Sequence, residues 1–149
     1  MIAAVRSILI AEDNANDVEL TLGALRANRV ANDVVVVRDG AQALDYLYCR
    51  NAYADRLPEN PGLILLDLKM PKVDGLEVLQ QVKEDPTLKT IPVVMLTSSR
   101  EEQDLVRTYD LGVNAYVVKP VVFSDFIEAV KALGQFWAVV NEPPPRIDR

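Results

Sequence analysis

Three carboxylates follow two short apolar runs of this chain. Glu12 and Asp13 come directly after residues 8–11, and Asp67 comes directly after residues 63–66. If the two runs are neighbouring parallel strands, their carboxyl ends meet at one edge of a sheet and the three carboxylates converge there. Their mutual repulsion then favours a bound divalent cation with oxygen ligands. The pattern predicts a magnesium-assisted site, with Asp67 as the candidate nucleophile.

Two other polar residues stand where apolar runs end. Thr97 follows Leu96; a threonine there is commonly structural, but its hydroxyl is also placed to donate to a phosphoryl oxygen. Lys119 follows Val118, and a lysine at the end of a buried strand needs a counter-charge, which the carboxylate cluster supplies. The tertiary amide between Lys119 and Pro120 permits a cis bond that would aim the lysine side chain.

The segments that must position these residues alternate along the chain. Short runs rich in Val, Ile and Leu are typical of strands buried on both faces, and the amphipathic stretches between them are typical of helices. Strict alternation predicts an α/β fold, a doubly wound five-stranded parallel sheet with five helices. We expect strands at 8–11, 34–37, 63–66, 91–96 and 115–118, and helices at 17–28, 41–50, 76–84, 101–111 and 123–140.

Several residues predict where these helices begin and end. Asn16, Asp39, Asp74 and Ser99 each stand three residues before a Glu or Gln, the spacing of a capping box. Gly112 predicts a helix stop, because glycine readily adopts the left-handed backbone conformation found just past helix ends.

Composition limits the domain count and the partners. The 149 residues, 50% of them hydrophobic, predict one domain at 1–140 and a proline-containing tail at 141–149, with no output domain. The net charge of −6 argues against nucleic-acid binding and favours a protein partner. A single cysteine, Cys49, excludes an internal disulfide, and the absence of histidine disfavours zinc. Neither a membrane span nor a signal peptide is apparent, so we expect a cytoplasmic protein with no membrane partner.

The ordered motifs resemble those of a known family. Glu12-Asp13, Asp67, Met70-Pro71-x-x-Asp74-Gly75, Thr97-Ser98 and Lys119-Pro120 together resemble the receiver domain of bacterial two-component response regulators, over residues 7–140. The resemblance implies a flavodoxin-like fold with strand order 2-1-3-4-5 and a phosphoryl group accepted by Asp67. It also implies that the chain is no enzyme beyond its own phosphorylation and dephosphorylation.

The same resemblance implies roles for the remaining site residues. Asp13, Asp67 and the backbone carbonyl of Lys69 would bind Mg²⁺, with Glu12 acting through water. Thr97 and Lys119 would contact the phosphoryl group. Tyr116 matches the aromatic residue that changes rotamer on activation, and its alternative interpretation is a half-exposed strand aromatic.

The phosphoryl donor must come from another protein, because the chain contains no histidine. The long connection at 51–61 and the ending Phe136-Trp137, followed by 141–145, resemble the single-domain response regulators that serve cyanobacterial and bacterial phytochromes. That resemblance implies a phytochrome-type histidine kinase as partner and a homodimer. An intermediate phosphorelay receiver, which passes the phosphoryl group to a phosphotransfer protein, is the alternative.

The last predicted helix carries two apolar stripes, too wide an arc for one domain to bury. One stripe contains Phe126 and Trp137. We expect the other to form a homodimer interface, and the alternative is that the C-terminal tail covers it. The second stripe consists of Ala129, Ala132, Phe136 and Val139.

Three other classes remain to be weighed. A haloacid-dehalogenase-like phosphohydrolase needs a second Asp two residues after its nucleophile, and that position here is Lys69. A flavodoxin-like electron carrier cradles the flavin phosphate in a Ser/Thr/Gly loop after the first strand, where Glu12 and Asp13 would repel it. A degenerate receiver that only binds partners lacks support, because every expected site residue is present.

Overall fold

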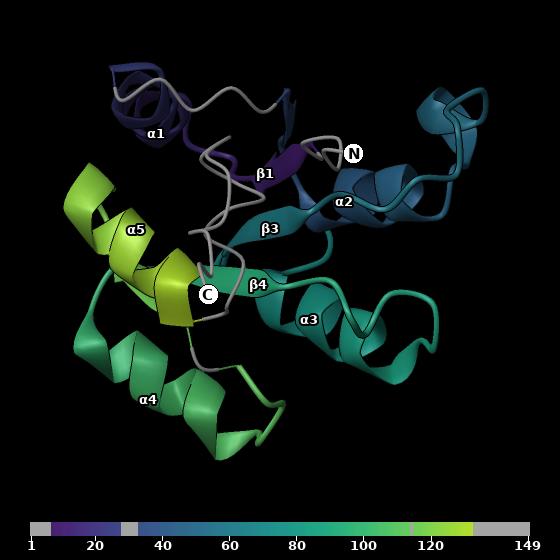
Figure 1. Ribbon diagram of the computed structural model, residues 1–149. Coiled ribbons are helices and arrows are strands. Elements are labelled where there is room, and N and C mark those ends of the chain that lie inside the picture. Colours follow the sequence, from purple (N-terminus) through teal and green to yellow (C-terminus); the bar gives the residue numbers. More distant parts are fainter. Residues whose placement is uncertain (1–6, 28–32, 114, 133–149) are drawn as a thin grey trace, which may run out of the picture.

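The computed structural model describes residues 7–27, 33–113 and 115–132 (Figure 1). The strands are β1 (Ile8–Ala11), β2 (Val34–Val37), β3 (Leu63–Asp67), β4 (Val93–Thr97) and β5 (Tyr116–Val118). The helices are α1 (Ala15–Ala27), α2 (Gly40–Leu47), the 3₁₀ helix η1 (Asn51–Tyr53), α3 (Gly75–Glu84), α4 (Arg100–Thr108) and α5 (Phe123–Ala132). All strand pairs are parallel, in the order β2-β1-β3-β4-β5, so the predicted fold class and strand order are confirmed.

Helices cover both faces of the sheet, with α1 and α5 on one side and α2, α3 and α4 on the other (Figure 1). Alternate strand residues feed the two cores because successive side chains of a strand point to opposite faces. Leu9 and Leu66 pack under α2 and α3, whereas Ile10 and Leu65 pack under α1 and α5. The apolar runs therefore encode a three-layer structure.

The prediction that all five strands are buried on both faces is wrong for the two edge strands. β1, β3 and β4 are buried throughout. In β2 only Val37 is fully buried, and in β5 Val118 is 41% exposed. An edge strand has one neighbour instead of two, so the flanking helices cover less of it.

Helix starts agree with the predicted caps at three positions. The side chains of Asp39, Asp74 and Ser99 accept hydrogen bonds from the backbone N–H three residues on, at 2.8, 2.9 and 3.3 Å. At α1 the prediction is wrong: Asn14, rather than Asn16, caps the helix by accepting from the N–H of Asp17 at 2.9 Å. The helix therefore begins at Ala15, two residues earlier than expected.

Helix ends were less predictable. α4 ends at Thr108, and Asp110 already has the positive φ of 50° that terminates the helix; Gly112, with φ of 77°, lies further along the loop. α2 ends at Leu47, followed by Cys49 with φ of 53°. The predicted continuation of the last helix to residue 140 lies outside the described residues.

Gly75 allows α3 to begin directly against the end of β3. Its N–H donates to the Leu68 carbonyl at 2.8 Å, and a Cβ at this position would lie 2.0 Å from the Asp67 carbonyl oxygen. No real side chain fits at that distance. Because it has no Cβ, Gly75 allows the start of α3 to lie directly against the backbone of Asp67 and Leu68.

The long connection after α2 is held by an arginine. Arg56 donates from Nε to the Tyr46 carbonyl at 2.9 Å, and its guanidinium lies 4.0 Å from the centre of the Tyr46 ring. Its Nη1 donates to the carbonyls of Leu57 and Glu59. These contacts order a segment that has only one short 3₁₀ turn of its own.

Candidate functional site

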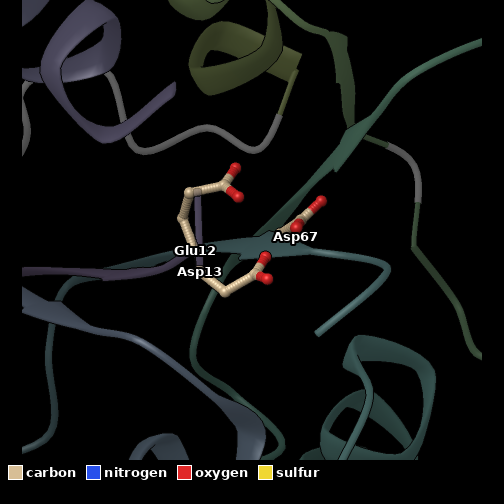
Figure 2. Close-up of side chains that lie close together, drawn as sticks. All are labelled: Glu12, Asp13 and Asp67. Carbon is tan, nitrogen blue, oxygen red and sulfur yellow. The ribbon is translucent and has the colours of Figure 1, made fainter. Parts of the chain in front are cut away.

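The sheet register brings the predicted site residues to one edge. Ala11 pairs with Leu66, and Asp67 pairs with Leu96, so β1, β3 and β4 end side by side. Figure 2 shows Glu12 and Asp13 at the end of β1 next to Asp67 at the end of β3. One carboxylate oxygen from each of the three lies within 4.8 Å of the others, so the predicted convergence is observed.

The three carboxylates differ in exposure. Glu12 is 1% exposed and Asp67 is 4% exposed, whereas Asp13 is exposed. They open into a polar cleft of about 650 Å³ that is also lined by Lys69, Ser98 and residues of the β1–α1 segment. Carboxylate oxygens are the donors that hard divalent cations take, and burial of two of them makes an uncompensated charge costly. The donor set therefore fits a divalent cation.

Lys119 lies among these carboxylates. Its Nζ is 3.1 Å from Glu12 Oε1 and 3.1 Å from Asp67 Oδ1, and its side chain is 14% exposed. Its backbone N–H donates to the Thr97 carbonyl at 2.8 Å, which ties the end of β5 to the end of β4. The bond to Pro120 is cis, as the sequence allowed. The predicted counter-charge for this lysine is thus confirmed.

Burial and charge shape the titration of the central pair. Burial, reinforced by the neighbouring charge of Glu12, raises the pKa of Asp67 to about 7, and Lys119 only partly opposes that rise. Burial alone would lower the pKa of Lys119, but Asp67 and Glu12 outweigh it and raise that pKa above its ordinary value. Lys119 is therefore a fixed cation, and Asp67 is a carboxyl group that gains from additional positive charge.

Thr97 and Tyr116 lie on the neighbouring strands β4 and β5, Thr97 at the strand end and Tyr116 two residues before the end of its strand. Thr97 is fully buried, and its Oγ1 accepts from Gln103 Nε2 at 3.5 Å. The Tyr116 hydroxyl donates to the Val113 carbonyl at 3.2 Å, and the guanidinium of Arg107 lies 4.7 Å from the centre of its ring. Tyr116 is half-buried in this arrangement.

The Lys69 side chain turns to α4. Its Nζ lies 3.4 Å from Glu102 Oε2, and the side chain is 78% exposed. The ammonium group is therefore held at the cleft mouth, which leaves the Lys69 backbone carbonyl as the group proposed for the metal.

One contact of the site was missed from the sequence. Asp17 Oδ2 lies 3.1 Å from Lys119 Nζ, the same distance as the two buried carboxylates. The available signal was its place in the first turn of the helix that follows Glu12 and Asp13, which brings it to the same edge of the sheet. In the sequence, Asp17 is one of several polar residues of an amphipathic helix, and its residue type alone does not distinguish it as a site residue.

The predicted dimer stripe is only partly described. Ala129 is 7% exposed and packs with Phe126 in the core under α5, so it does not lie on an outer surface as the stripe required. The side chain of Ala132, as well as Phe136 and Val139, lies outside what the structure describes. None of the described helices has the length and apolar character needed to cross a bilayer.

Comparison with known proteins gives the family. Residues 8–131 match the response regulator receiver domain, and the chain belongs to this family. Receiver domains act in two-component signalling and bind divalent metal.

Similar proteins share most of the chain's length. The response regulator Rcp1 of Synechocystis sp. is 38% identical over 130 residues, which cover 87% of this chain and 87% of that protein. The solved structure of the bacteriophytochrome response regulator AtBRR is 61% identical with a TM-score of 0.89 and covers 94% of this chain and 100% of that chain. The Mn²⁺-bound form of Rcp1 is 36% identical with a TM-score of 0.72 and covers 95% and 99%.

Proposed function

We propose that this chain is a response regulator whose Asp67 accepts a phosphoryl group from a partner histidine kinase, with Mg²⁺ as cofactor. The observation that carries the proposal is the Lys119 ammonium group, 3.1 Å from Asp67 and Glu12 at the edge of the sheet where Asp13 also lies. Phosphoryl transfer needs an in-line nucleophile and fixed positive charge around the transferred group, and this edge supplies both.

The transfer step is a displacement at phosphorus. A carboxylate oxygen of Asp67 attacks the phosphorus atom, and the P–N bond to the donor histidine breaks, with the bonding electrons passing to the imidazole. The product is an acyl phosphate on Asp67. Lys119 and the Thr97 hydroxyl then contact the phosphoryl oxygens, and Tyr116 responds by changing rotamer. This chemistry is confined to the chain's own aspartate.

The proposed metal ligands are Asp13, Asp67 and the backbone carbonyl of Lys69, with Glu12 acting through water. A bound Mg²⁺ supplies positive charge that offsets the carboxylates and the incoming phosphoryl oxygens. A solved structure of the response regulator Rcp1 is the Mn²⁺-bound form, which supports binding of a divalent cation by this chain. The acidic donor set of this chain supports the same conclusion independently of that relative.

We assign the kinase to the phytochrome type. The similarity to AtBRR, described as a bacteriophytochrome response regulator, supports this partner. With no histidine in the 149 residues, the phosphoryl donor is a different molecule. A histidine kinase presents its phosphohistidine in the cytoplasm, so the same proposal places the chain there.

Phosphotransfer profiling tests this function. The chain is incubated with Mg²⁺ and a panel of autophosphorylated histidine kinases that includes phytochrome-type ones, and the label on each protein is followed over time. We expect fastest transfer from a phytochrome-type kinase and no transfer to Asp67→Asn. Labelling of Asp67→Asn would overturn the acceptor, and transfer only from unrelated kinases would overturn the partner.

We also propose a homodimer formed through Ala132, Phe136 and Val139 of the helix that the sequence predicts at 123–140. The support is the second apolar stripe of the sequence, less Ala129. Sedimentation of wild-type protein and of Phe136→Glu, at the same high micromolar concentration, tests it. Dimers of the wild type and monomers of the variant are expected, whereas a monomeric wild type would favour the tail-covering alternative.

A further inference from the structure

Lys119 is held by hydrogen bonds to two carboxylates besides its ion pair with Asp67. An ammonium group carries three N–H donors, and its nitrogen lies 3.1 Å from each of three carboxylates, those of Glu12, Asp17 and Asp67. A phosphoryl group on Asp67 must therefore draw the ammonium group toward itself against the attraction of the two carboxylates that hold it, Glu12 and Asp17.

The three partners are not equally easy to release. Glu12 is 1% exposed, and its other oxygen also accepts from the backbone N–H of Asn14 at 3.2 Å. Asp67 is the residue that carries the phosphoryl group. The Asp17 side chain is 24% exposed, so water replaces a lost contact there more easily than at the two buried carboxylates.

Asp17 is nonetheless well anchored at the rim of the cleft. Its N–H is capped by Asn14, and its carbonyl accepts from the Thr21 hydroxyl at 2.9 Å, so its backbone is fixed in the first turn of α1. The positive end of the helix dipole favours a negative side chain at that place. The carboxylate therefore remains close to Lys119 without itself belonging to the cluster of metal-ligand candidates.

We propose that Asp17 is a positioning residue that holds Lys119 in the unphosphorylated protein and competes with the phosphoryl group for it. This inference rests on the proposed function of Asp67. When the phosphoryl group arrives, Lys119 leaves Asp17 for a phosphoryl oxygen, and the Asp17 carboxylate turns to water. Asp17 thereby sets how strongly the site holds a phosphoryl group, and it does so through Lys119.

Binding of beryllofluoride in the presence of Mg²⁺ tests the competition, because this anion imitates a phosphoryl group on a carboxylate. Affinity is measured by calorimetry for wild type, Asp17→Asn, Asp17→Glu and the control Glu19→Gln, which removes one negative charge from the exposed side of the same helix. We expect Asp17→Asn to bind about fivefold more tightly, equivalent to ~1 kcal/mol, the upper end for a partly exposed ion pair. Asp17→Glu and Glu19→Gln should stay close to wild type.

A second measurement asks whether the effect passes through Lys119. Initial rates of labelling by acetyl phosphate are compared for Asp17→Asn made in wild type and in Lys119→Ala. Asp17→Asn should raise the labelling rate in the wild-type background and should leave it unchanged in the Lys119→Ala background. A gain that persists without Lys119 would show a general charge effect and overturn the inference.

The outcomes separate this inference from the proposed function. A wild-type protein that binds no beryllofluoride and takes no label contradicts the function of Asp67 itself. If wild-type protein binds beryllofluoride and takes label, but Asp17→Asn binds beryllofluoride with the same or lower affinity, only the competition by Asp17 is contradicted. Circular dichroism of each variant checks folding, and Asp17→Ser replaces Asp17→Asn if the latter does not fold.

Discussion

The two adjacent carboxylates that follow β1 differ in burial and in contacts. Glu12 is buried and contacts Lys119, whereas Asp13 is exposed to the cleft. Both oxygens of Glu12 already accept hydrogen bonds, one from Lys119 and one from the backbone N–H of Asn14, so Glu12 offers less to a metal than Asp13 does. This difference supports the proposal that Asp13 ligates the metal directly and that Glu12 acts indirectly.

Magnesium binding should therefore depend mainly on Asp13. We expect Glu12→Gln to weaken Mg²⁺ binding by about tenfold, the lower end for a group that acts on a metal indirectly, and Asp13→Asn to weaken it by more, because a direct ligand is lost. Calorimetric titration of both variants against wild type measures the two effects. Equal losses would show that direct and water-mediated ligation have been assigned the wrong way round.

Lys119 should be needed for the stability of the metal-free site. Lys119→Ala leaves Glu12 and Asp67 buried without their cation, which costs about 3–5 kcal/mol when one member of a buried pair is lost. Added Mg²⁺ should restore much of that loss, since it supplies charge at the same place. Lys72→Ala is the matched control, because Lys72 is 69% exposed and pairs with Asp39 at 3.5 Å outside the cluster.

Urea denaturation with and without Mg²⁺ measures both variants. Lys72→Ala should change stability by less than about 1 kcal/mol in either condition. If Lys119→Ala is as stable as wild type without metal, the lysine is not the counter-charge of the cluster.

At the residue scale, strand ends were the predictive signal. Glu12, Asp13, Asp67, Thr97 and Lys119 each follow or end an apolar run, and parallel strands must bring such positions to one edge. Asp17 reaches the same edge from a helix, and which helical side chain turns toward the cleft depends on where that helix begins.

At the scale of elements, strand positions follow from the sequence more directly than helix ends do. Apolar runs specify the strands because burial on both faces leaves little choice of residue type. Helix ends depend on single residues in the left-handed conformation, and here Cys49 and Asp110 take it rather than a glycine. Asn and Asp tolerate that conformation, but an Asn or Asp in a loop does not by itself predict that the residue adopts it.

The β3–α3 junction yields a prediction about Gly75. Gly75→Ala places a Cβ 2.0 Å from the Asp67 carbonyl oxygen, so the loop or the strand end must move. Overpacking of this kind costs about 1–3 kcal/mol, and the displacement should also weaken Mg²⁺ binding because Asp67 and Lys69 flank the junction.

Gly23→Ala is its control. Gly23 lies within α1, and a Cβ there would have no atom within 4 Å, so alanine should stabilise the helix by about 0.5–1 kcal/mol. Urea denaturation and Mg²⁺ titration compare the two variants. A Gly75→Ala protein with wild-type stability and metal affinity would mean that the close approach does not constrain the site.

For the whole molecule, the titration of Asp67 links the site to folding. Its pKa is about 7 in the folded, metal-free protein, whereas an unfolded chain gives Asp a pKa of about 3.9. Between those two values the folded state keeps a proton that the unfolded state has released. The contribution of Asp67 to the free energy of unfolding therefore falls as the pH rises through this window.

The proposed Mg²⁺ should reverse that trend, because it would bind the deprotonated carboxylate. The metal should raise the melting temperature most above about pH 7, and progressively less at lower pH, where its binding must displace a proton from Asp67. Melting temperatures of wild type and Asp67→Asn, measured across this range with EDTA or with Mg²⁺, isolate the contribution, since the other carboxylates are common to both proteins. In EDTA, wild type should lose stability relative to Asp67→Asn as the pH rises. A constant difference between the two would show that Asp67 titrates at its ordinary pKa, and the burial of the site would then impose no cost on the fold.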